Sequence, residues 1–91
     1  MIRLNIRDTM GRLIELDCDP NWKLATLINE YKVKHEAKYG NVAKKTILFT
    51  FNGEDLNPED DENLNEIDLE DGVTIVAAFL LVNYLNIFIN Y

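Results

Sequence analysis

A strand followed by a tight turn is the feature that most constrains how this chain can fold. Ile47, Phe49 and Phe51 stand at every second position, which is the period of a strand that buries one face. Asn52-Gly53 follows, and this dipeptide favours the two positive φ angles of a type I′ hairpin turn. A second β-rich run, 73–79, comes after an acidic loop. Because the two strands are far apart in sequence, we expect a sheet to join them and a helix to cover it.

The N-terminal residues predict a two-stranded hairpin with a turn at Met10-Gly11-Arg12. Apolar and polar residues alternate on both sides of this turn, and the apolar set is Ile2, Leu4, Ile6, Ile14, Leu16 and Cys18. Because Cys18 continues an apolar face, we expect a packed thiol rather than a reactive one. It is the only cysteine, so neither an intramolecular disulfide nor a cysteine-based metal site is expected. A reduced intracellular compartment is favoured.

A single helix is predicted after this hairpin. Asp19-Pro20-Asn21 has the capping side chain and the proline that suit a helix start. Leu24, Leu27, Ile28 and Tyr31 then form one helical stripe, and Gly40-Asn41 ends it. His35, the only histidine, falls at the edge of the stripe. We expect a partly packed structural role for it, because no nucleophile or metal partner lies near it in sequence.

Composition limits the classes of function. Ninety-one residues with 47% apolar content predict one globular domain. The net charge of −7 argues against nucleic-acid binding, which needs a positive surface. Six of the nine basic residues lie between positions 22 and 45, whereas 54–71 holds ten carboxylates and no basic residue. Two interpretations stay open, namely solvated faces or a dipolar surface that orients the protein on a partner.

Several short patterns stand in a fixed order in the second half of the chain. They are Phe49-x-Phe51-Asn52-Gly53-x-x-Leu56-Asn57, then Asp60, then Ile67-x-Leu69-Glu70-Asp71, and Thr74-Ile75. Together with the preceding hairpin and helix, this order resembles the ubiquitin-like β-grasp family, and within it the SUMO branch more than ubiquitin. The resemblance covers residues 1–78 and implies an α+β fold of ββαββ type with one packed helix. Its mixed sheet would have the first and last strands parallel at the centre, with Val73, Ile75 and Ala77 facing the helix.

The chain departs from this family at positions that carry its functions. Ubiquitin-like modifiers end in a Gly-Gly that is conjugated, but no glycine follows Gly72, so we expect no covalent conjugation. The centre of the aliphatic recognition patch of ubiquitin aligns with Thr50, so that patch is expected to be weakened. SUMO reads extended peptides between its second strand and its helix. Two of the lysine positions around that groove align with Asp17 and Asp19, so a preference for acidic peptides is expected to be lost or reversed.

No pattern indicates catalysis. The carboxylates of 59–62 lack a cleft and a second chemical group, and their spacing is not that of a calcium-binding EF-hand loop. Gly-rich phosphate motifs are absent from the sequence. We therefore expect no enzyme activity, no cofactor and no metal site. A strand pattern that begins beside Met1 also leads us to expect no signal or transit peptide.

The C-terminal residues form a second unit, 79–91, beyond a domain at 1–78. No charged residue occurs from Gly72 to Tyr91, yet the first part must serve as the last strand, and about 13 residues are too few to cross a bilayer. Packing on its own sheet, docking on a partner protein and contact with a membrane without spanning it all remain open. The candidate interaction residues are Phe79, Leu80, Leu81, Val82, Tyr84, Leu85, Ile87, Phe88, Ile89 and Tyr91, with Asp17 and Asp19 at the groove.

These patterns lead to one functional hypothesis and two alternatives. The hypothesis is a non-conjugated ubiquitin-like protein that acts as a structural or interaction subunit, docked on other protein subunits partly through its apolar C-terminal residues. The first alternative is a free adaptor that binds extended peptides between the second strand and the helix. The second is an accessory subunit of a membrane complex, including a mitochondrial one. The expected location is intracellular, either cytoplasmic or nuclear, with a mitochondrial location as the variant.

Overall fold

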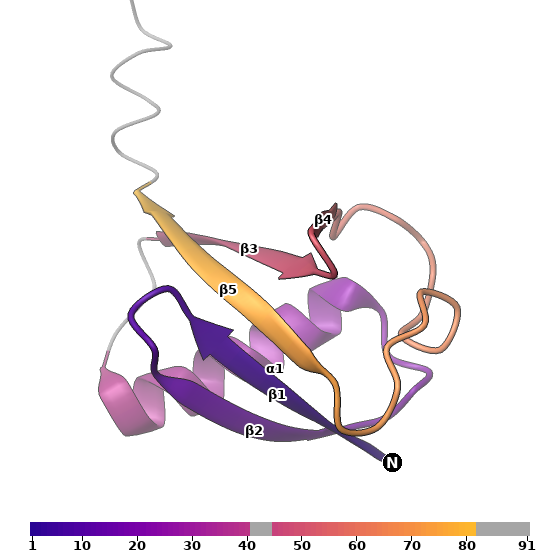
Figure 1. The fold of residues 1–91 in the computed structure, drawn as a ribbon, viewed down its shortest axis with the longest axis horizontal. Helices are drawn as coiled ribbons and strands as arrows, with labels where there is room; N and C mark the ends of the chain where they lie inside the picture. Colours follow the sequence, from indigo (N-terminus) through magenta and orange to yellow (C-terminus); the bar gives the residue numbers. More distant parts are fainter. Residues whose placement is uncertain (41–44, 82–91) are drawn as a thin grey trace, which may run out of the picture.

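The computed structural model describes residues 1–40 and 45–81 and forms a five-stranded sheet with one helix across one face (Figure 1). The elements are β1 (Ile2–Asp8), β2 (Leu13–Cys18), α1 (Leu24–Tyr39), β3 (Lys45–Phe51), β4 (Glu54–Leu56) and β5 (Thr74–Leu81). The strand order is β2-β1-β5-β3-β4. This architecture confirms the predicted α+β fold with a helix packed on a mixed sheet.

The two strands at the centre of the sheet come from opposite ends of the described chain. β1 and β5 pair in parallel, with Ile6 beside Ile75, whereas the other neighbouring pairs are antiparallel. The predicted parallel pairing of the first and last strands is confirmed. β2 and β4 are the two edge strands, so their outer backbone groups have no strand partner within the sheet.

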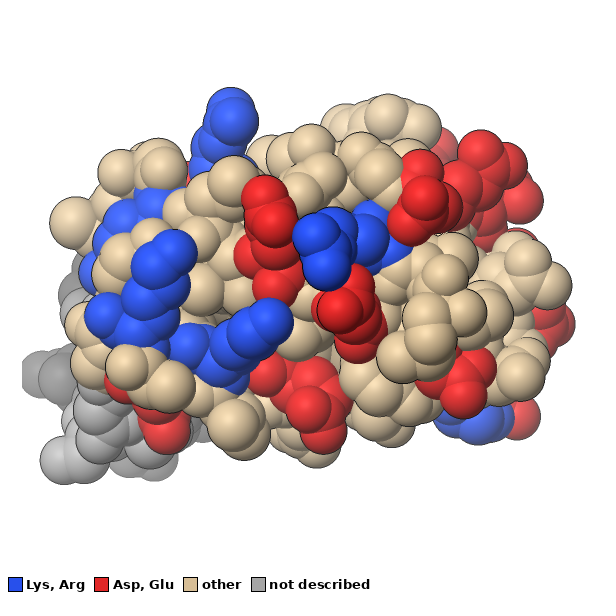
Figure 2. Space-filling view, turned by 90° about the horizontal axis from the view of Figure 1, so that it is seen from below, with Lys and Arg blue, Asp and Glu red and all other residues tan. Residues whose placement is uncertain are grey.

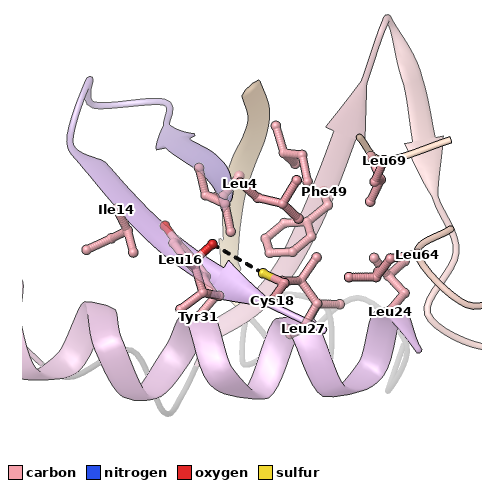
Figure 3. Close-up of a cluster of buried hydrophobic side chains, with 14 of the residues drawn as sticks. Leu4, Ile14, Leu16, Cys18, Leu24, Leu27, Tyr31, Phe49, Leu64 and Leu69 are labelled. Atoms are coloured by element: carbon pink, nitrogen blue, oxygen red, sulfur yellow. Dashed lines mark hydrogen bonds between the residues drawn. The ribbon is translucent and has the colours of Figure 1, made fainter. Parts of the chain in front are cut away.

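The core lies between α1 and the inner face of the sheet (Figure 3). The inward positions of β1, β3 and β5 are apolar at every second residue, and Leu4, Phe49 and Ile75 are fully buried. α1 contributes the predicted stripe, of which Leu27 and Tyr31 are fully buried. The alternate apolar residues of the strands and the apolar stripe of α1 therefore pack together in one continuous core.

The hairpin between β3 and β4 has the predicted turn. Asn52 and Gly53 have φ angles of 52° and 80°, as a type I′ turn requires at its two central positions. The strands then pair with Phe49 opposite Leu56. This pairing directs Leu56 to the same inner face of the sheet as Phe49.

The predicted helix start is wrong by about one turn. α1 begins at Leu24, and its cap residue, Lys23, makes no side-chain capping bond. The side chain of Asp19 instead accepts a hydrogen bond from the Asn21 amide at 2.8 Å, and the Trp22 amide bonds to the Asp19 carbonyl. These bonds form a tight turn. Lys23 then forms a β-bridge with Asn63, which delays the helix.

Two further expectations need correction. His35 is 1% exposed, so it is fully buried rather than partly packed as expected. β5 continues to Leu81 and pairs with β3 over its last residues, with Phe79 opposite Ile47. The expected boundary at residue 78 therefore falls inside this strand. The predicted helix end at Gly40 is confirmed. The Gly40 amide donates a hydrogen bond to the Glu36 carbonyl, and Gly40 itself has a φ of 105°.

Candidate protein-interaction surfaces

The face of the sheet that is turned away from α1 carries a short apolar stripe. On β5 the outward residues Val76 and Leu80 are 42% and 44% exposed, with the half-buried Ala78 between them. Leu48 of β3 lies opposite Ala78. We call Leu48, Val76, Ala78 and Leu80 the outer stripe. Its position follows from strand alternation, since the residues between them point into the core.

Thr50 lies at one end of this stripe, opposite Val76. Its hydroxyl donates a hydrogen bond to the carboxylate of Asp55 at 3.3 Å. Because its hydroxyl is bonded to a carboxylate, Thr50 forms a polar boundary of the apolar surface rather than its centre. The apolar surface is therefore displaced along β5 toward Leu80.

The C-terminal candidate residues divide into three groups. Phe79 points inward, where its ring lies parallel to Tyr31 with 6.3 Å between centroids and edge-on to His35 at 5.1 Å. It belongs to the core. Leu80 belongs to the outer stripe, and Leu81 ends β5. The others (Val82, Tyr84, Leu85, Ile87, Phe88, Ile89 and Tyr91) lie outside the described residues.

A second surface is the groove of about 700 Å³ between β2 and α1. Asp17 lines it, but Arg3 of the neighbouring strand holds this carboxylate through an Nε–Oδ1 contact of 2.9 Å. The hydrogen bond and charge of Arg3 lower the pKa of Asp17. Asp19 does not line the groove. The two aspartates are thus not brought together as a paired acidic site.

Two side chains of α1 reach the edge of β2. The Lys34 ammonium donates a hydrogen bond to the Glu15 carbonyl at 2.9 Å, and the Tyr39 hydroxyl donates one to the Leu13 carbonyl at 3.3 Å. These carbonyls belong to the outer edge of β2, where an added strand would bind. Sequence reasoning missed both residues as groove residues. For Tyr39 the available signal was the i, i+4, i+8 spacing of Tyr31, His35 and Tyr39, which continues the helical stripe.

Charge is distributed unevenly over the surface. In Figure 2 the basic residues gather toward the left of the view, and acidic residues predominate toward the right. Lys34 and Lys38 of α1 line the groove beside β2, whereas the carboxylates of 54–71 belong to β4 and the connection to β5. The domain is therefore dipolar along its length.

A polar cluster is buried at the end of β1. The carboxylate of Asp8 contacts Arg12 Nε at 2.7 Å and accepts hydrogen bonds from the Met10 and Arg12 amides at 2.9 Å. Burial alone would raise the pKa of Asp8, but these bonds outweigh it and the pKa is lowered. The Tyr31 hydroxyl is also buried and has no hydrogen-bond partner among the described residues. Burial raises its pKa to about 12. The contacts of Asp8 join the end of β1 to the turn that precedes β2.

Cys18 is the packed thiol that the sequence predicts. It is fully buried, and its sulfur donates a hydrogen bond to the Leu16 carbonyl at 3.4 Å, drawn as the dashed line in Figure 3. Burial raises the pKa of the Cys18 thiol to about 11. The thiol is therefore protonated at neutral pH and shielded from reagents.

Neither a metal centre nor a membrane-spanning helix is present in the part of the chain that the structure describes. Within residues 1–40 and 45–81, no three His, Cys, Asp or Glu side chains are grouped so that they would hold a metal ion. Over the same ranges, no helix has both the length and the apolar character needed to cross a bilayer.

Comparison with known proteins identifies the architecture. No family model matches the sequence. The search of curated proteins finds no similar sequence. Among solved structures, 232 chains match, so the fold is common and the likeness alone does not assign a task.

Two of these structures illustrate the match. One comes from work on molecular mimicry of SUMO that promotes DNA repair, with a TM-score of 0.66 and 22% identity over 84% of this chain and 88% of that chain. The other, solved by NMR, is a computationally designed protein based on a template of human erythrocytic ubiquitin. It has a TM-score of 0.65 and 25% identity over 87% of this chain and 91% of that chain. Strand order, parallel central pair and helix position agree with this likeness, and the chain therefore folds as a ubiquitin-like β-grasp domain.

Proposed function

We propose that this protein is a non-conjugated ubiquitin-like subunit of a larger protein assembly, and that it docks through the outer stripe. The observation that carries the proposal is the exposure of Val76 and Leu80 on β5. Burying such a side chain completely in an interface contributes about 1.5–3 kcal/mol. The stripe is bounded by Thr50 on one side, and the sequence continues from Leu80 into uncharged residues. A partner that covers Leu80 would thus also meet the start of the C-terminal residues.

The test compares the wild-type chain with Leu80→Asp in the native source. We expect the tagged wild-type protein to elute from gel filtration with a partner at fixed stoichiometry, well above its own 10.5 kDa. Leu80→Asp should shift it to the monomer position, because a carboxylate cannot be buried in an apolar contact without a partner charge. Val33→Asp is the matched control, since Val33 is an exposed apolar residue of α1. A wild-type protein that elutes as a monomer in fresh extract would refute the proposal.

A second candidate function is peptide binding at the β2 edge, which the groove beside α1 favours. An extended peptide would add a strand to β2 by backbone hydrogen bonds. In the isolated protein this function requires displacement of Lys34 and Tyr39 from the Glu15 and Leu13 carbonyls. A monomeric wild-type protein that nevertheless binds extended peptides at β2 would favour this adaptor role over the subunit role.

A further inference from the structure

A second groove lies at the opposite edge of the sheet, beside β4. It has a volume of about 450 Å³ and is enclosed by the β3–β4 hairpin, the start of α1 and the connection that follows β4. Its floor includes Phe51, Leu56 and Ile67, which pack against the core yet remain partly exposed. A cleft of this size is within the roughly 300–1,000 Å³ typical of binding pockets.

The rim of this groove carries charge of one sign. Five acidic residues line it: Glu54, Asp55, Asp60, Glu62 and Asp68. Of these, Asp55 directs its carboxylate to the Thr50 hydroxyl on the outer face of the sheet. No Lys, Arg or His is among the lining residues. Lys23 lies nearby in the chain but is ion-paired with Asp61, which does not line the groove. Over the described ranges 1–40 and 45–81, none of these five acidic residues has a cationic partner.

The walls of the groove are held in place by the fold. Glu54 stands opposite Phe51 beside the tight hairpin turn. The far wall is fixed by hydrogen bonds from the Leu64 amide to the Trp22 carbonyl at 2.9 Å and from the Leu69 amide to the Leu64 carbonyl at 3.1 Å. Because the hairpin turn fixes one wall and these hydrogen bonds fix the other, binding costs little reorganisation.

We infer that this groove binds a basic segment of a partner protein, in which lysine or arginine alternates with apolar residues. A lysine or arginine side chain has an aliphatic stem and a cationic end, so its stem matches the apolar floor and its charge matches the rim. A metal ion fits less well, because no three candidate ligands are grouped in the described residues. The net charge of −7 would also steer a basic partner toward the domain. This surface is separate from the outer stripe, with which it shares no residue.

The test is a titration of the full-length, isotope-labelled protein with a short peptide of alternating lysine and leucine, followed by NMR. We expect amide shifts to concentrate at 52–56 and at Ile67. The double variant Glu54→Gln, Asp68→Asn should weaken binding about tenfold, because two charge contacts are lost. Asn tolerates the left-handed φ of 63° at position 68. Glu59→Gln is the matched control, since this exposed carboxylate belongs to the same connection but does not line the groove.

Changes in the probe test the apolar floor without disturbing the protein. Replacing the leucines of the peptide by serine should weaken binding about fivefold, which corresponds to loss of roughly one apolar contact. Two results would overturn the inference. One is equal weakening per removed charge by Glu59→Gln and by the double groove variant, which would indicate unspecific charge attraction. The other is binding of the polyamine spermine, which lacks apolar side chains, as tightly as the leucine-containing peptide.

Discussion

The Nε2 atom of His35 lies 3.4 Å from a carboxylate oxygen of Asp8, and both side chains are buried. The two residues come from the end of β1 and the last turns of α1. Arg12 closes the cluster from the solvent side, with its guanidinium 5.3 Å from the centre of the Tyr39 ring. The contact therefore joins the β1–β2 hairpin to the C-terminal part of the helix.

Replacement of Asp8 by asparagine should lower the free energy of unfolding by about 2 kcal/mol, because buried charge-assisted hydrogen bonds are worth more than neutral ones. Asparagine keeps an oxygen for the Met10 and Arg12 amides but loses the ionic contact with the guanidinium. Urea denaturation measures the change. Asp17→Asn is the control, because the Arg3–Asp17 pair is exposed and should contribute little. If Asp8→Asn and Asp17→Asn lost equal unfolding free energy, burial would not be what strengthens the contacts of Asp8.

The same carboxylate should make stability depend on acid pH. The folded pKa of Asp8 lies below its ordinary value of 3.8, so the unfolded chain binds more protons as the pH falls past that value. The stability that Asp8 contributes is complete above pH 3.8 and is lost as the pH falls through the lower, folded pKa. Unfolding free energies measured from about pH 6 down to about pH 2 should therefore converge for wild type and Asp8→Asn. A constant difference between them would contradict this linkage.

Local patterns were sufficient to predict β1, β2, β3 and β5, because apolar residues alternate with polar ones or form a β-rich run in each of these segments. The short β4 is not among the four strands of the predicted ββαββ order. Ile75 and Ala77 face the helix as expected, and Asn52-Gly53 forms its turn from its own backbone preferences. The start of α1 was not predictable in this way. Asp19 is a good capping residue in isolation, but a bond between the Trp22 carbonyl and the distant Leu64 amide decides the local path.

The interaction surfaces could not be predicted in this way, because they depend on contacts between segments that are distant in sequence. Asp17 looked like a free groove carboxylate because its partner, Arg3, lies on the neighbouring strand. The groove beside β4 depends on Phe51 and Ile67 being brought together by the fold. The acidic character of that region could be predicted from the sequence. Its apolar floor could not, because Phe51 and Ile67 have the sequence pattern of ordinary core residues.

Phe49→Ala should destabilise the domain by about 3–5 kcal/mol, as truncation of a buried aromatic residue leaves a cavity. Phe49 is fully buried and meets the Tyr31 ring edge-on with 5.5 Å between centroids. Thermal and chemical denaturation measure the loss. Val33→Ala on the exposed face of α1 should change stability by less than about 0.5 kcal/mol. A small effect at position 49 would mean that Phe49 is not central to the core.

Gly53→Ala should cost about 1 kcal/mol, because an alanine at the φ of 80° has its Cβ too close to the backbone. No atom beyond the two neighbouring residues lies within 4 Å of the added Cβ, so the cost is conformational. Urea denaturation measures it, with Glu54→Ala in the same hairpin as the control for loss of local structure. A stability unchanged by Gly53→Ala would show that the turn relaxes to another type.

The donors on the β2 edge should compete with strand addition. In the double variant Lys34→Met, Tyr39→Phe, the Glu15 and Leu13 carbonyls lose their side-chain partners, while the ring at position 39 is kept. An uncharged peptide of alternating valine and threonine should then bind at β2 more tightly than it binds wild type, since no existing hydrogen bond must be broken. NMR shifts along Leu13–Cys18 follow the binding.

Lys38→Met separates this competition from a change of charge. Lys38 lines the same groove and lies over the Tyr39 ring at 5.2 Å, but its ammonium makes no hydrogen bond to β2 among the described contacts. It should therefore leave the affinity for the uncharged peptide as in wild type. If Lys38→Met increased affinity as much as the double variant, removal of a positive charge would be the cause. The hydrogen bonds to the Glu15 and Leu13 carbonyls would then not hinder strand addition at β2.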